Sequence, residues 1–83
     1  MKTSLEDISS VKKKILIEIE PEEVDRQFNE AYRELGKRVK IPGFRPGKVP
    51  RSILEGRFRK QVVEDVTKEL ISDTLPKALE EVN

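Results

Sequence analysis

Apolar and polar residues alternate along residues 11–19, and this period of two is the first structural signal in the chain. The odd-numbered apolar positions are Val11, Ile15, Ile17 and Ile19. Because successive side chains of a strand point to opposite faces, the pattern predicts a β-strand with one buried face. Thr3 and Leu5 indicate a weaker partner strand, with a turn through residues 6–10. A two-stranded hairpin is marginally stable by itself, so we expect it to lie on an apolar surface.

A helical pattern follows in residues 21–39. Its apolar positions, at steps of 4, 3, 4 and 4, are Val24, Phe28, Ala31, Leu35 and Val39. This spacing predicts an amphipathic helix of about five turns with one apolar stripe. Pro21 suits the first turn of a helix, and the basic residues near residue 40 complement the carboxyl end of its dipole. Pro42 ends the helix, because proline removes a backbone donor and clashes with the preceding turn.

Two more helices are expected after residue 49. Pro50 opens a short helix through Leu54, which Gly56 closes. A longer helix over residues 59–82 has apolar side chains at spacings of 3 and 4, which are Val62, Val66, Leu70, Ile71, Leu75, Ala78, Leu79 and Val82. Pro76 lies inside this helix, so we expect a kink there or a restart capped by Thr74.

The apolar side of this last helix is wider than a two-stranded hairpin would cover. Two explanations fit: the isolated chain self-associates, or further strands of the same domain lie beyond Asn83. The abrupt end in the sequence EEVN, without a turn or a polar tail, favours the second.

Residues 41–50 read IPGFRPGKVP and can form neither a helix nor a central strand. Gly43 and Gly47 permit backbone angles that are closed to other residues. Three prolines, at positions Pro42, Pro46 and Pro50, fix φ and restrict the residue before each. The segment is therefore a shaped loop with few accessible conformations.

The loop presents Phe44, Arg45 and Lys48 between these shaping residues. An aromatic ring in such a loop either fills the core or contacts a partner, and composition alone slightly favours the core.

Charge is concentrated around this loop, although the whole chain of 83 residues has a formal net charge of only +1. Residues 33–60 hold ten Lys or Arg against two Asp or Glu, whereas residues 1–32 and 61–83 have net charges of −3 and −4. Such a patch attracts an anionic partner. Its supporting members are Arg38, Lys40 and Arg51. The plain alternative is an ordinary solvated surface.

The sequence contains few residues that could act in catalysis or bind a metal. The chain has neither histidine nor cysteine, which removes the usual neutral-pH base, the thiol nucleophile and the usual zinc ligands. Adjacent helical carboxylates such as Glu22 and Glu23 point about 100° apart and do not converge on a substrate. A phosphate-binding P-loop is excluded because Pro42 replaces its first glycine and Val49 replaces its Ser or Thr. We therefore expect no catalytic residue, no metal site and no cofactor.

Neither a secretory h-region nor an apolar run of the roughly 18 residues needed to span a bilayer is found. The sequence predicts a cytoplasmic protein without a membrane partner.

Two binding functions remain. The first is a basic RNA-binding module that acts through general electrostatics, although only Phe44 and Phe58 accompany the cations. The second is a protein-docking module in which Phe44 is an apolar anchor and Arg45 is its charged neighbour, a combination that is common at interface hot spots.

The segment GFRPGKVP resembles the signature loop of the trigger factor family, the bacterial chaperones at the ribosomal polypeptide exit. The resemblance extends over the early hairpin, the helix that leads into the loop, and the sequence RSILEGRFRKQVVEDV after it. It implies that residues 1–83 are an incomplete ribosome-binding domain, without the isomerase and carboxy-terminal chaperone domains of the family. The implied fold is α+β, with the hairpin packed on two long helices that are joined by the signature loop and the short helix.

The resemblance also implies the partners. The family's tip triplet corresponds to Phe44, Arg45 and Pro46, which would contact a large-subunit ribosomal protein at the exit tunnel. Adjacent ribosomal RNA is available to the flanking cations, and the nascent polypeptide is a further candidate partner. In the best-known members the third residue of the triplet is lysine, so Pro46 removes a charge for which Lys48 compensates in part.

Overall fold

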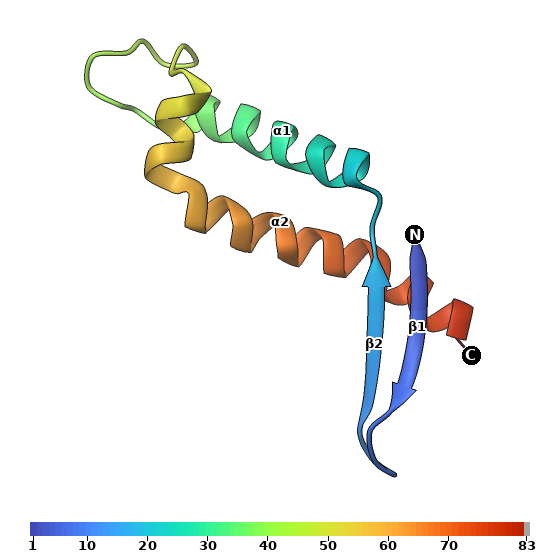
Figure 1. The fold of residues 1–83 in the computed structure, drawn as a ribbon. Coiled ribbons are helices and arrows are strands. Elements are labelled where there is room, and N and C mark those ends of the chain that lie inside the picture. Colours follow the sequence, from blue (N-terminus) through green and yellow to red (C-terminus); the bar gives the residue numbers. More distant parts are fainter. Residues whose placement is uncertain (83) are drawn as a thin grey trace.

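The computed structural model describes residues 1–82, which form a hairpin and two helices in an elongated molecule. The elements are β1 (Lys2–Asp7), β2 (Lys13–Glu18), α1 (Pro21–Arg38) and α2 (Arg51–Val82). The molecule measures 56 × 22 × 16 Å, and the hairpin and the loop between the helices lie at opposite ends (Figure 1). The predicted α+β class, with a hairpin followed by two long helices, is confirmed.

The hairpin is antiparallel and pairs Thr3 with Ile17 and Leu5 with Ile15. Its strands agree with the period-two pattern, but β2 begins at Lys13. Val11 lies in the turn instead and is 87% exposed. In that turn the Lys12 carbonyl accepts hydrogen bonds from two backbone N–H groups, and the Ser9 hydroxyl accepts one from the Lys12 N–H at 3.0 Å.

The core lies between α1 and α2 on the side of the loop. Its buried members are Tyr32, Leu35, Ile41, Leu54, Val62 and Val66. Gly36 allows the helices to approach here, because a Cβ at this position would lie 3.3 Å from Leu54 Cδ1. The predicted stripe of α1 faces this cluster, with Phe28 and Ala31 packed against it.

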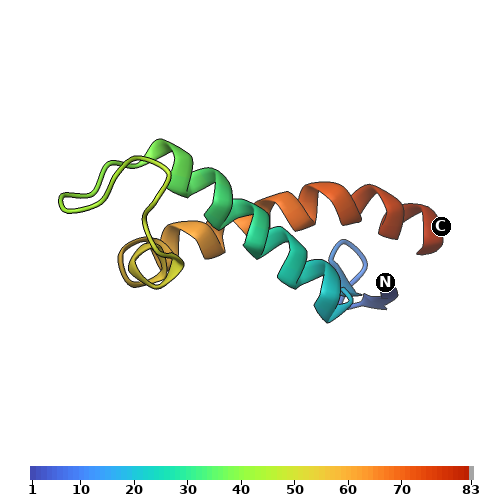
Figure 2. The same ribbon diagram turned by 90° about the horizontal axis from the view of Figure 1, so that it is seen from above.

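The prediction of a separate short helix after the loop is wrong. Residues 51–82 form one helix, and Gly56 does not adopt the positive φ of a glycine that closes a helix. Leu54 and Phe58 belong to the same core, so packing favours continuing the helix past Gly56. The helix is nevertheless bent, since the yellow first turns of α2 run at an angle to the rest of the helix (Figures 1 and 2).

Of the two alternatives predicted at Pro76, a kink or a restart, the restart is wrong. The helix continues through Pro76, and Thr74 does not cap a new helix. The Thr74 hydroxyl instead donates a hydrogen bond to the Leu70 carbonyl at 2.6 Å, one turn back within the same helix.

The hairpin packs on α2 and not on α1. The Thr3 hydroxyl donates a hydrogen bond to Glu81, and Ala78 in this part of α2 is fully buried. Other apolar residues of α2 stay uncovered here, as expected from its wide apolar face: Ile71, Leu75 and Leu79 are 37–51% exposed. Neither described helix combines the length and the apolar character needed to cross a bilayer.

Candidate functional site

The loop between the helices, residues 41–50, is anchored at both of its ends; we call it the tip loop. Ile41 is 6% exposed and belongs to the core cluster, and Val49 packs against the same cluster. Before the loop, the Val39 N–H donates to the Leu35 carbonyl at 3.1 Å, and Val39 ends α1 in an extended conformation. The base of the tip loop is therefore fixed, while its middle projects beyond the helices (Figure 2).

Two consecutive turns build the projecting part. In the first, the Phe44 N–H donates to the Ile41 carbonyl at 3.1 Å, with Pro42 and Gly43 in the central positions. The second repeats this arrangement, since the Lys48 N–H donates to the Arg45 carbonyl at 2.9 Å across Pro46 and Gly47.

The central glycines of the two turns have φ values of +92° for Gly43 and +78° for Gly47. Proline followed by a glycine of positive φ is typical of a type II turn. The repeated Ile-Pro-Gly-Phe and Arg-Pro-Gly-Lys segments thus give the loop the restricted shape that the sequence predicts.

Phe44 and Arg45 lie side by side where the first turn meets the second. The Phe44 side chain is 40% exposed, and it is not among the residues that form or contact the core cluster. Arg45 is exposed, and within residues 1–82 no carboxylate pairs with it. The structure thus places Phe44 outside the core, and its contact with a partner stays a prediction.

The remaining loop residues have identifiable structural positions. Pro46 is the first central residue of the second turn, and Lys48 is the last residue of that turn and is exposed. The Pro50 carbonyl accepts hydrogen bonds from the N–H groups of Ile53 at 3.1 Å and Leu54 at 3.3 Å. Pro50 therefore caps the amino end of α2, one position before the helix begins.

The three supporting cations have different environments. Arg38 and Lys40 are exposed at the end of α1. Arg51 is tied into the structure: its Nε donates to Glu55 at 2.8 Å, it also donates to the Asn29 side chain, and its guanidinium carbon lies 4.9 Å from the centre of the Tyr32 ring. Arg51 consequently joins the start of α2 to α1 and is more than a surface charge.

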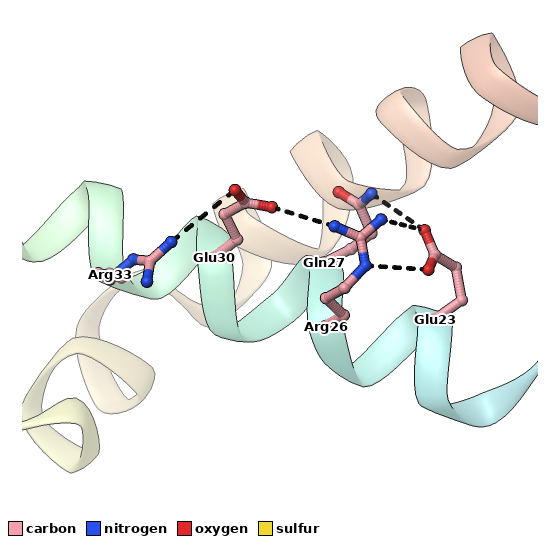
Figure 3. Close-up of polar contacts among 5 residues, drawn as sticks. All are labelled: Glu23, Arg26, Gln27, Glu30 and Arg33. Carbon is pink, nitrogen blue, oxygen red and sulfur yellow. Dashed lines mark hydrogen bonds and ion pairs between the residues drawn. The ribbon is translucent and has the colours of Figure 1, made fainter.

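A ladder of ion pairs runs along the exposed face of α1 (Figure 3). Arg26 lies 2.6 Å from Glu23 and 3.7 Å from Glu30, and Arg33 lies 3.8 Å from Glu30. The hydrogen bond from Arg26 holds the pKa of Glu23 below its ordinary value and raises the pKa of Arg26 itself. The ladder ends at Arg33, close to the tip loop.

A groove of about 310 Å³ lies there, between α1, the second turn of the tip loop and the start of α2. Its floor includes the apolar side chains of Tyr32, Val49 and Leu54, and its cationic side chains are Arg33, Lys37 and Arg51. We call it the basic groove. The sequence counts Arg33 and Lys37 in the basic segment but does not indicate a groove. The available signal is the spacing of Arg33 and Lys37, four residues apart and each directly after a buried residue of α1.

Comparison with known proteins gives consistent matches over the whole chain. A family model described as bacterial trigger factor protein (TF) matches residues 1–83. Trigger factor of Syntrophotalea carbinolica is 49% identical over 79 residues, which is 95% of this chain and 18% of the relative. Trigger factor of Desulfatibacillum aliphaticivorans is 47% identical over 81 residues, which is 98% of this chain and again 18% of the relative. The chain therefore spans less than a fifth of the length of these relatives.

A solved structure reported for domains of trigger factor from Thermotoga maritima and their interactions also matches. It superposes with a TM-score of 0.73 at 25% identity, over all of this chain and 75% of that one.

Proposed function

We propose, because the chain belongs to the trigger factor family, that it docks a cotranslational chaperone onto the ribosome beside the polypeptide exit. The tip loop is the proposed contact, and its partner is a protein of the large subunit with ribosomal RNA nearby. The isomerase domain of the family lies outside these 83 residues, so we propose no catalytic role for the chain. Ribosome docking places the protein in the cytoplasm, and the nascent polypeptide is a further proposed partner.

One observation carries this proposal: a partly exposed aromatic ring and an exposed arginine stand together at the tip of an anchored loop. The Phe44 ring is 40% exposed, and Arg45 follows it at the start of the second turn. Aromatic rings and arginines contribute a disproportionate share of interface energy. Because the two turns hold the pair in place before binding, little conformational entropy is lost when the partner is contacted.

The other loop residues have supporting roles in this proposal. Gly43, Gly47, Pro42 and Pro50 hold the shape of the loop, while Arg38, Lys40 and Lys48 supply a field that speeds the approach to an acidic site. Pro46 lacks the charge of the lysine that is usual in the family at this position. It also restricts the backbone of the second turn. Lys48 restores a positive charge two residues further along.

The test is cosedimentation with ribosomes of the wild-type chain and of a Phe44→Ala, Arg45→Ala double variant. We expect the double variant to lose binding, while its helicity by circular dichroism stays unchanged because neither side chain supports the core. Arg59→Ala with Lys60→Ala is the matched control, since it removes two exposed cations of α2 that lie outside the tip loop. Loss of helicity together with binding in the loop variant would show that Phe44 is structural.

The second candidate is an electrostatic RNA binder, which the ten cations against two acidic residues in residues 33–60 favour. It predicts that the Arg59, Lys60 control loses as much binding as the loop variant. It also predicts that the chain binds protein-free ribosomal RNA, with a steep decrease in affinity as salt increases. Docking on a protein predicts that the loop variant is affected far more, and that removing the ribosomal protein from the particle removes the binding.

A further inference from the structure

The basic groove combines two features that a single kind of partner would use. Three cationic side chains, from Arg33, Lys37 and Arg51, surround an apolar floor, and no carboxylate is among its lining residues. We propose that the groove binds an acidic protein segment that inserts one apolar side chain between its carboxylates. This inference rests on the proposed ribosome docking and extends it, because it assigns the tip loop a second contact surface and a chemical class of partner.

Two of the three cations of the groove, Arg33 and Lys37, can accept such a partner. Arg33 and Lys37 make long ion pairs with carboxylates of their own helix, at 3.8 Å from Glu30 and 3.5 Å from Glu34. Both cations are about two-thirds exposed, and exposed pairs of this kind contribute little to stability. A docking carboxylate can therefore share these cations without disrupting a strong interaction.

The floor of the groove distinguishes a protein from an RNA. An RNA backbone would use the cations, but it would leave the partly exposed apolar surface of Val49 unfilled. Base stacking on the ring of Tyr32 is blocked, because Tyr32 is only 5% exposed and the Arg51 guanidinium covers it at 4.9 Å. An apolar side chain fills this floor, and a volume of about 310 Å³ is at the lower end of the range for ligand pockets.

The groove also continues the proposed docking surface. Gly47 and Val49 of the tip loop line it, and Gly47 is a central residue of the turn that begins with Arg45. A protein bound at the tip therefore needs only to follow the second turn to reach the groove. Because the turn is fixed by its own hydrogen bond, the two contacts are held at a constant spacing.

The four glycines of the chain offer a direct test by two-dimensional NMR, because their amide signals form a separate group in the spectrum. Gly36 and Gly47 line the groove, whereas Gly43 and Gly56 do not. The probe is the peptide Asp-Glu-Leu-Glu-Asp, titrated into the 83-residue chain. We expect the signals of Gly36 and Gly47 to shift and those of Gly43 and Gly56 to stay in place.

Two further peptides separate the contribution of charge from that of the apolar side chain, and one RNA tests the alternative partner. Asp-Glu-Gly-Glu-Asp keeps the charge but lacks the apolar side chain, and Asn-Gln-Leu-Gln-Asn keeps the leucine but lacks the charge. Both are expected to bind more weakly than the full probe. A uridine oligonucleotide that shifts Gly36 and Gly47 more than the full peptide would assign the groove to RNA and overturn the proposal. Equal binding by the leucine and glycine peptides, or no shift at all, would overturn it as well.

Protein variants test the same point from the other side. Arg33→Gln and Lys37→Gln should each weaken peptide binding by about two- to fivefold, the value for an exposed ion pair. Arg57→Gln is the matched control, because it removes an exposed cation of α2 that does not line the groove. An equal loss in all three variants would indicate general electrostatics and contradict a groove.

The two proposals fail in different ways. The Phe44→Ala, Arg45→Ala variant should lose ribosomes and still bind the peptide in the groove, since neither residue lines it. Conversely, the wild-type chain could cosediment with ribosomes while its Gly36 and Gly47 signals do not shift when the peptide is added. That result would support the docking loop and contradict the groove.

Discussion

The two ends of this molecule are packed very differently. Among residues 1–82, six of the seven buried apolar side chains form the cluster beneath the tip loop, and only Ala78 lies apart from them. At the hairpin end, Leu5, Ile8 and Leu16 are 40–61% exposed. Ile71 and Leu79 of α2 are exposed to a similar extent. The tip loop thus stands on nearly all of the well-packed core, whereas the hairpin rests on one face of one helix.

This difference explains how a small chain can hold a loop in one shape. A domain of about this size buries only about 60% of its unfolded surface, so its core is limited. Here the core is placed where Ile41 and Val49 enter and leave the loop. The hairpin end makes fewer buried contacts, and we expect it to open locally before the loop end does.

The largest effect should come from the core beneath the loop. Leu54 is 3% exposed, and Leu54→Ala should lower the free energy of unfolding by about 2–5 kcal/mol because it leaves a cavity. Leu79, at the hairpin end, is 41% exposed, and Leu79→Ala should change the free energy by less than about 0.5 kcal/mol. Urea unfolding followed by circular dichroism measures both. Similar costs for the two variants would mean that the ends are equally packed.

A second matched pair compares two glycines that both have open space where a Cβ would lie. Gly47 has a φ of +78°, so Gly47→Ala should destabilise the turn by about 1–2 kcal/mol. Gly56 lies within α2, so Gly56→Ala should stabilise the helix by about 0.5–1 kcal/mol. Thermal unfolding should show a lower melting temperature for Gly47→Ala and a higher one for Gly56→Ala. Ribosome cosedimentation should decrease for Gly47→Ala alone. A neutral Gly47→Ala would show that the turn does not need its positive φ.

These features divide into those that sequence can predict and those that it cannot. The alternation of Ile15 and Ile17 and the stripe from Val24 to Leu35 predict β2 and α1, because each pattern repeats with the period of its element. The repeated Pro-Gly pairs likewise predict a shaped loop. Such signals are local, so a single sequence is sufficient to find them.

The missed features depend on contacts between distant residues. Gly56 is a plausible helix end by propensity, but packing of Leu54 and Phe58 in the core carries the helix through it. Arg51 looks like one more surface cation until the fold brings it to Asn29 and Tyr32 on α1. The basic groove is missed for the same reason, since its floor and its cations come from three separate segments.

The uncovered apolar surface at the hairpin end predicts weak self-association of the isolated chain. Leu79 and Val63 are both 41% exposed on α2, and Val63 lies on the part nearer the loop. We expect sedimentation equilibrium to show a mass that increases with concentration. Leu79→Lys should weaken the association by about tenfold, because each copy loses the apolar surface that Leu79 would bury in a symmetric dimer. Val63→Lys is the control and should have little effect. A compact monomer at high concentration would contradict the prediction.

The smallest expected effect concerns the ion-pair ladder of α1, which runs from Glu23 to Arg33. The hydrogen bond from Arg26 lowers the pKa of Glu23 in the folded chain. Because the folded-state pKa is the lower one, the stabilising contribution is present in full above the unfolded-state value of about 4.3. It is lost as the pH decreases through the folded-state pKa. The contribution to stability is small, since both side chains are exposed to solvent.

An NMR titration of the Glu23 side-chain carbonyl can measure this shift without relying on stability. Arg26→Gln should bring the pKa of Glu23 back toward its ordinary value, because the main cause of the shift is removed. Arg33→Gln changes the other end of the ladder, and Arg33 makes its ion pair with Glu30 rather than with Glu23. It should therefore leave the pKa of Glu23 in place. Equal changes in both variants would mean that charge along the whole of α1, and not one hydrogen bond, sets the pKa of Glu23.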